Sequence, residues 1–203
     1  MSSAPGMSVP VPPAEPTRWP LIVGVIGLVY GGLGCCADTF FLAATAFSPW
    51  FASLMGIKNP PEMPNQAIFL VSTLATLALC ILLVVGSVQL LRRRASARST
   101  LMAWVVARLV MLVVGLVIGF ATLQGQVDYG EKWDQTVKAM VEERQPGATA
   151  KMPPFDRKRQ ELMARYSLVG MSVLFLAYPL FLGVLLTNRA KRAEIESWRN
   201  ELR

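Results

Sequence analysis

Residues 101–123 read LMAWVVARLVMLVVGLVIGFATL. Arg108 is the one charged residue in this stretch, and the others are predominantly apolar. About 20 such residues in a helix cross the ~30 Å hydrocarbon core of a bilayer. Because hydrocarbon offers no partner for backbone N–H and C=O groups, a spanning segment of this kind must be helical. The stretch therefore predicts a membrane-spanning helix.

Three more apolar runs of similar length occur at residues 21–47, 67–91 and 167–187. We therefore expect an all-α membrane protein, a four-helix transmembrane bundle over residues 21–187 with short amphipathic helices outside the bilayer. The first run contains motifs similar to signal-peptidase sites. It continues well past Cys35, however, whereas the core of a signal peptide spans only ~7–15 residues. Cleavage of this run is the less favoured alternative.

The segments outside the four runs are short. Residues 1–20 hold six prolines, a composition typical of a disordered or extended tail. The outer loop, residues 124–166, has apolar residues at helical spacing, which predicts a short amphipathic helix that ends at Gln145-Pro146-Gly147. The basic tail, residues 188–203, has a similar pattern, so we expect the fourth helix to extend into the cytoplasm. The predicted faces consist of Trp133, Val137, Met140 and Val141 in the loop, and of Ile195, Trp198 and Leu202 in the tail.

Composition excludes several classes of function. Only 16% of the residues are charged, against roughly a quarter in soluble domains. Histidine, the commonest general base and metal ligand, is absent, and the chain has no HExxH, GxSxG, Walker-type or GxGxxG motif. We therefore expect no catalysis, no cofactor and no metal site. The formal charge of +7 in so apolar a chain indicates membrane orientation rather than nucleic-acid binding.

The basic residues also predict the orientation of the chain. The flanks on the side of the two termini hold ten Lys and Arg, and the opposite flanks hold nine. The totals barely differ, but the connection between the second and third runs is short, rich in Arg and free of acids, and short loops carry most of the positive-inside signal. We therefore expect both termini in the cytoplasm. The arginines expected to contact anionic headgroups at that face are Arg92, Arg93, Arg94, Arg98 and Arg108.

Glycines recur at helical spacing in the first and third runs. Small residues let helix backbones approach closely in a membrane, so these positions predict helix packing. Packing of the first helix on the third helix of the same chain is the favoured interpretation, and a seam between two copies of the chain is the alternative. The positions are Gly24, Gly27, Gly31 and Gly34 in the first run, and Gly115 and Gly119 in the third.

Asp38 continues the glycine stripe by one turn, so its side chain is expected to face protein rather than lipid. Ionisable residues within a span are costly and are therefore candidates for function. At a similar depth the second run offers the hydroxyls of Ser72, Thr73 and Thr76. The favoured interpretation is a structural, hydrogen-bonded carboxyl group. The alternative is a proton or cation site.

Arg108 lies about seven residues from the cytoplasmic end of its span, from where a long side chain can reach the headgroups. Its depth is expected to differ from that of Asp38 by ~10–15 Å, at 1.5 Å per residue, so we predict no ion pair between them. Gln89 is its expected neighbour. The three cysteines, Cys35, Cys36 and Cys80, lie in spans and are expected to act as small apolar residues, with a disulfide between the first and second helices as the less favoured alternative.

Residues 89–98, QLLRRRASAR, resemble the connection between the second and third spans of many small uncharacterised bacterial four-span proteins. Tyr178-Pro179-Leu180-Phe181 with the basic exit Asn188-Arg189-Ala190-Lys191 resembles their last helix, and Trp19-Pro20 before a glycine-rich helix resembles their first. The resemblance implies a four-span architecture in a bacterial inner membrane. It implies no activity.

Together these features favour a non-catalytic membrane protein, an accessory, scaffold or self-associating subunit of a membrane assembly. Its expected partners are the lipid bilayer and a second membrane protein or a second copy of the chain. The alternative is a small transporter or channel that uses Asp38. A transport pathway needs polar residues near the bilayer midplane, and the sequence offers few of them.

Overall fold

The structure, a computed structural model, describes residues 17–57 and 60–201 of the 203-residue chain. All regular structure in these residues is helical, which confirms the predicted fold class. Four of the helices, α1 to α4, are long and apolar enough to cross a membrane. Most of the predicted proline-rich tail, residues 1–16, lies outside the described residues. The elements are α1 (Trp19–Leu54), α2 (Gln66–Leu91), α3 (Ala97–Arg144), the short 3-10 helix η1 (Ala148–Lys151), α4 (Arg157–Thr187) and α5 (Arg189–Glu201).

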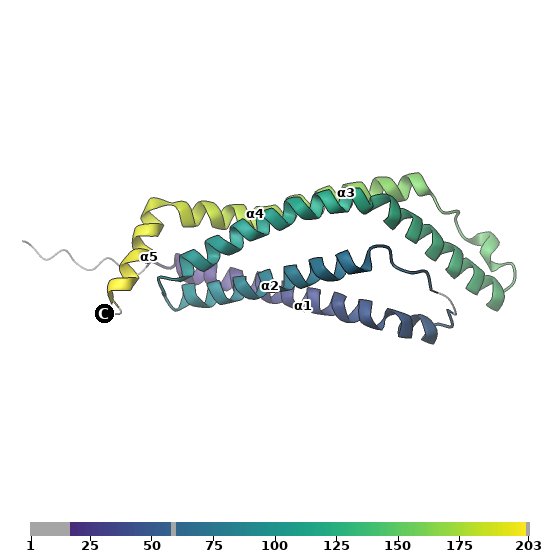
Figure 1. The fold of residues 1–203 in the computed structure, drawn as a ribbon, viewed down its shortest axis with the longest axis horizontal. Coiled ribbons are helices and arrows are strands. Elements are labelled where there is room, and N and C mark those ends of the chain that lie inside the picture. Colours follow the sequence, from purple (N-terminus) through teal and green to yellow (C-terminus); the bar gives the residue numbers. More distant parts are fainter. Residues whose placement is uncertain (1–16, 58–59, 202–203) are drawn as a thin grey trace, which may run out of the picture.

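The four long helices pack in chain order, α1 on α2, α2 on α3 and α3 on α4, each antiparallel to the next (Figure 1). The start of α1, the α2–α3 connection and α5 lie at one end of the bundle, which we call the terminal end. The α1–α2 and α3–α4 connections lie at the other end, the loop end. In Figure 1 the α1–α2 pair and the α3–α4 pair lie close together at the terminal end and diverge along the bundle, until the second half of α3 turns back toward the end of α1.

The hydrophobic core lies in the terminal half of the bundle. Its largest fully buried side chains come from α2, α3, α4 and α5 together, so it joins all of these helices. The loop half has few buried apolar residues, of which Leu123 and Val127 of α3 are two. The bundle is therefore held together mainly at one end. The core side chains with less than 2% exposure include Leu83, Leu90, Leu101, Trp104, Leu182, Leu186 and Ile195.

Helix α3 is longer than the predicted third span. The sequence predicted a separate short helix in the outer loop, but residues 124–144 continue α3 without a break and the helix ends, as predicted, before Pro146. No proline lies between Leu123 and Arg144, so nothing in this segment obliges the helix to end earlier. Figure 1 shows that α3 changes direction in its second half. Arg144 Nη2 donates a hydrogen bond of 2.6 Å to the backbone oxygen of Met55, which ties the end of α3 to the end of α1.

Helix α1 continues through Pro49 to Leu54, beyond the predicted end of the first run. Proline has no N–H, so a helical proline frees the carbonyl four residues before it, here that of Thr45. The Ser48 hydroxyl donates to this Thr45 oxygen at 3.0 Å. A local side chain therefore satisfies the carbonyl, and the helix can continue.

Helix α5 does not continue α4, contrary to the prediction. The backbone turns at Asn188 (ψ 126°), and the Asn188 side-chain oxygen accepts a hydrogen bond of 3.0 Å from the backbone N–H of Ala190, which starts a new helix. The apolar face predicted from the sequence is the reason for the turn, since Ile195 and Trp198 are buried against the terminal end of the bundle. Leu202, the third predicted member of this face, lies outside the described residues.

Candidate functional site

The glycine stripe of α1 packs inside the chain, on α2. A Cβ atom added at Gly24 would lie 2.7 Å from Leu91, and one at Gly34 would lie 2.6 Å from the Cys80 sulfur. Gly31 is equally close to α2, and Gly27 to α2 and to Tyr178 of α4. The predicted partner, α3, is not the helix that covers the stripe. The close approach of α1 and α2 therefore depends on these glycines.

The second pair of glycines does not form such a seam. A Cβ atom at Gly119 would meet Leu168 of α4 at 2.7 Å, whereas one at Gly115 would have no atom within 4 Å. Gly115 instead lines two cavities between the helices. The sequence pattern treats both glycines alike, but only one of them is in close contact with a neighbouring helix.

Asp38 has a partner that the sequence did not indicate. The Cys80 thiol of α2 donates a hydrogen bond to Asp38 Oδ2 at 3.8 Å. The predicted hydroxyl neighbours bond to their own helix instead: Ser72 and Thr73 both donate to the Phe69 oxygen at 2.8 Å, and Thr76 donates to the backbone of the preceding turn. The three cysteines are free, so the structure has no disulfide between α1 and α2.

Arg108 is closer in depth to Asp38 than the sequence predicted. Gly86 lies against Leu101 across the antiparallel α2–α3 pair, so Cys80 is about level with Arg108. Gly34 faces Cys80, and Asp38 lies one turn beyond Gly34 along α1. The difference in depth between Asp38 and Arg108 is therefore roughly 5 Å rather than 10–15 Å. No ion pair joins the two charges in the described part of the chain.

The Arg108 side chain lies among the helices. Its Cζ atom is 5.5 Å from the centre of the Phe175 ring of α4, a cation–π contact. Gly183 of α4 faces Val105 of α3, and the two helices run antiparallel. Counted along each helix from that contact, Phe175 lies about one turn closer to the loop end than Arg108 does. This placement does not favour the predicted contact of Arg108 with headgroups. The expected neighbour, Gln89, instead accepts a hydrogen bond of 3.0 Å from Thr100.

Two cavities follow one another along the side of α3 that faces α2 and α4. The inner cavity, of about 360 Å³, lies between α2, α3 and α4. The distal cavity, of about 470 Å³, lies between α3 and the start of α2. They share Gly115, and we call the two together the groove. The inner cavity is lined by Thr76, Arg108, Met111, Leu112, Gly115, Leu116, Ser167, Leu168, Met171, Ser172 and Phe175, and the distal one includes Asn65, Phe69, Ser72, Gly119, Gln126 and Tyr129.

Three aromatic rings lie on the terminal side of the groove. Tyr30 of α1 and Tyr178 of α4 stack with ring centres 4.9 Å apart, and Trp104 of α3 meets both rings edge to face. Neither tyrosine hydroxyl has a hydrogen-bond partner among the described residues. The aromatic residues come from three helices, so no sequence spacing could have predicted the cluster. It joins α1 to α4, which are not neighbours in the chain order.

The arginines of the α2–α3 connection remain at the terminal end. Arg92, Arg93 and Arg94 are exposed, which is compatible with the predicted contact with headgroups, and Arg98 donates from Nε to the Leu186 oxygen at 3.4 Å. Among the described residues no group of three or more Cys, Asp or Glu could hold a metal ion. Comparisons of the chain with protein-family models, with curated proteins and with solved structures find no match.

Proposed function

We propose that this chain is a non-catalytic accessory or scaffold subunit of a membrane assembly. The supporting observation is that only a small fraction of the residues in the candidate spans is buried by the rest of the chain. In the most apolar 18-residue window of each helix, 11% of the residues are buried in α2 and in α4, and 17% in α3. The remaining surface of these helices is available to other helices as well as to lipid.

The α4 helix offers an uncovered apolar face. Val173, Leu174 and Val184 keep 63–72% of their surface exposed. Helices associate within a bilayer through van der Waals packing and close approach rather than through the hydrophobic effect. The glycine stripe of α1 is already covered by α2, so it is not available to a partner helix. The proposal places the partner on α4.

The experiment is photo-cross-linking in native membranes, followed by the mass of the gently purified particle. A photoreactive residue at Val173 should give a cross-linked product of one defined mass, and the purified particle should contain a second membrane protein or a second copy in fixed stoichiometry. The same photoreactive residue at Ser99, exposed in the first turn of α3, is the control and should not give that product. A particle that contains one copy of this chain alone, with no product at Val173, contradicts the proposal.

A small transporter is the second candidate, and the contacts of Asp38 favour it. Asp38 has a thiol partner, and its depth differs from that of Arg108 by about one turn, so two opposite charges lie in the spanning part of the bundle. In reconstituted vesicles, Asp38→Asn should abolish any proton or cation flux that the protein supports. Equal flux in the variant and in the unsubstituted protein removes the support for this candidate.

A further inference from the structure

The inner cavity contains a charge that the chain does not neutralise. No Asp or Glu of the described residues lies within ion-pair distance of Arg108, and its Nε atom is buried without a hydrogen-bond partner. The Arg108 guanidinium group contacts the face of the Phe175 ring of α4, which carries no net charge. A cation inside a bilayer is costly unless it is paired. Arg108 therefore creates a site in which an anion is stabilised.

The nearest acid in depth cannot provide that anion. Asp38 lies on α1 and is bound by the thiol of Cys80. Arg108 lies on α3 and contacts Phe175 of α4. Helix α2 stands between the two positions, since α1 packs on α2 and α2 packs on α3. Two of the hydroxyls that line the inner cavity, those of Thr76 and Ser172, donate to carbonyls of their own helices, and a neutral hydroxyl does not supply a negative charge.

The shape of the groove indicates which kind of anion fits. Its walls beside Arg108 are aliphatic, with Met111, Leu112 and Leu116 on α3. At Gly115 the wall has no side chain, and there the inner cavity meets the distal one. Each cavity has a volume within the range of about 300–1,000 Å³ that is typical of ligand pockets. The groove thus joins a charged cavity to a second cavity with a mainly apolar lining.

We propose that the groove binds a long-chain fatty acid, with its carboxylate on Arg108 and its hydrocarbon chain running past Gly115 into the distal cavity. The guanidinium group presents N–H donors in a planar fork that matches a carboxylate. The protonated acid is uncharged and can enter an apolar groove, and the adjacent cation then favours the ionised form.

The experiment uses the purified full chain in nanodiscs of phosphatidylcholine, with the fluorescent fatty acid cis-parinaric acid as the probe. Energy transfer from tryptophan to the probe should saturate at one probe per chain. The methyl ester of the probe, which has the same hydrocarbon chain without the charge, should bind at least tenfold more weakly. Arg108→Gln should weaken binding of the acid at least tenfold, Arg108→Lys should weaken it less, and Arg94→Gln, at an exposed arginine outside the groove, should leave it unchanged.

A second variant tests the path of the hydrocarbon chain without altering the charge. Gly115→Leu adds a side chain where a Cβ atom meets nothing within 4 Å, so the fold should tolerate it while the groove narrows. This variant should no longer bind cis-parinaric acid but should still bind the shorter octanoate. Binding of octanoate is measured by displacement of the probe from the unsubstituted protein and by calorimetry on the variant.

The proposal is overturned if acid and ester bind alike, if Arg108→Gln binds as tightly as the unsubstituted protein, or if Gly115→Leu has no effect. It is overturned equally if the purified chain binds neither probe, as expected if the acidic side chain of a partner helix occupies the groove. The test needs no partner protein, so its result is independent of the proposed accessory role.

Discussion

At the scale of single residues, the α1–α2 contact depends on the absence of side chains. Gly27 lies so close to Ser87 that an added Cβ atom would overlap its hydroxyl, and it would also lie 2.9 Å from the Tyr178 oxygen. Gly32, on another side of the same helix, has no atom within 4 Å of such a Cβ position. The two glycines are alike in sequence and differ only in what faces them.

Gly27→Ala is therefore expected to destabilise the protein, and Gly32→Ala is not. Overpacking of a close contact costs roughly 1–3 kcal/mol. At Gly32 the substitution only improves helix propensity, by up to about 1 kcal/mol. Thermal unfolding in detergent, followed by tryptophan fluorescence, should show a lower midpoint for Gly27→Ala and an equal or higher one for Gly32→Ala. Equal midpoints for both variants would show that the α1–α2 contact relaxes without cost.

The stability of the turn after α3 is expected to depend on pH through Glu142. The Thr149 hydroxyl and the backbone N–H of Gly147 both bond to its carboxylate and hold the pKa of Glu142 below its usual value of 4.5. A lowered pKa in the folded state means that the ionised group stabilises the turn after α3 above about pH 4.5, and that this contribution is lost as the pH falls through the lowered value. Hydrogen exchange of residues 145–150 should be faster in Glu142→Gln than in the unsubstituted protein at neutral pH. The two rates should converge below pH 4.5, and a constant ratio across the range would contradict the assignment.

The sequence indicated that Asp38 faces protein, and the structure gives it a protein partner, yet the partner is Cys80 and not a hydroxyl. Hydroxyls in a helix can bond to the carbonyl of the preceding turn, and Ser72, Thr73 and Thr76 all do so. Depth along a single helix can be counted from the sequence. The relative shift of two helices cannot, because it depends on packing such as that of Gly34 on Cys80.

At the scale of elements, hydropathy located all four spans, since about 20 apolar residues leave one structural solution in a bilayer. It did not reveal that α3 continues beyond its apolar part or that α5 turns away from α4. Each of these features is accompanied by a contact between segments that are distant in the sequence. Arg144 near the end of α3 bonds to Met55, and Trp198 on the apolar face of α5 stacks on Trp19 at the start of α1.

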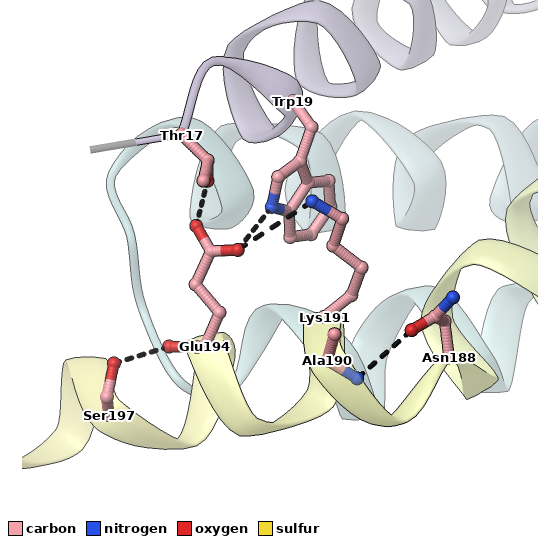
Figure 2. A network of polar contacts seen from close by, with 7 residues as sticks. All are labelled: Thr17, Trp19, Asn188, Ala190, Lys191, Glu194 and Ser197. Atoms are coloured by element: carbon pink, nitrogen blue, oxygen red, sulfur yellow. Dashed lines mark hydrogen bonds and ion pairs between the residues drawn. The ribbon is translucent and has the colours of Figure 1, made fainter. Parts of the chain in front are cut away.

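The docking of α5 provides the element-scale prediction. Trp19 Nε1 donates to Glu194 at 2.7 Å, and Lys191 lies 5.0 Å from the centre of the Trp19 ring (Figure 2). The Trp19 ring also stacks on Trp198 of α5. The Thr17 hydroxyl also donates to Glu194. Trp19→Phe keeps an aromatic ring for stacking and removes the N–H donor. The loss should be roughly 1.5 kcal/mol, the lower limit for a charged acceptor, because Glu194 is partly exposed.

Hydrogen exchange in residues 189–198 should therefore accelerate in Trp19→Phe, while the exchange of α2 stays unchanged because the opening is local. Trp133→Phe makes the same substitution at the loop end, where Trp133 stacks on Tyr129, and serves as the control. If Trp133→Phe accelerates exchange in α5 to the same extent, the effect comes from general loss of stability and not from the bond to Glu194.

At the scale of the whole molecule, the bundle has two unlike ends. The terminal end holds the core, both described ends of the chain and the exposed arginines of the α2–α3 connection. At the loop end, Arg157 of α4 forms ion pairs with Asp128 and Glu131 of α3. The groove begins beside the core at Arg108 and extends into the half of the bundle that has few buried apolar residues.

The positive-inside rule then predicts which end faces the cytoplasm. The connection between α2 and α3 is short, carries four arginines within seven residues and has no acid, whereas the loop end mixes both signs of charge. Ser96→Cys and Ala150→Cys place a thiol at the terminal end and at the loop end. In intact cells a membrane-impermeant maleimide should label Ala150→Cys and not Ser96→Cys, and after lysis it should label both. The unsubstituted chain, whose three cysteines lie within the spans, is the control and should stay unlabelled throughout. The opposite pattern would place both termini outside the cytoplasm, and the arginines of residues 92–98 would then have to be explained by a role other than orientation.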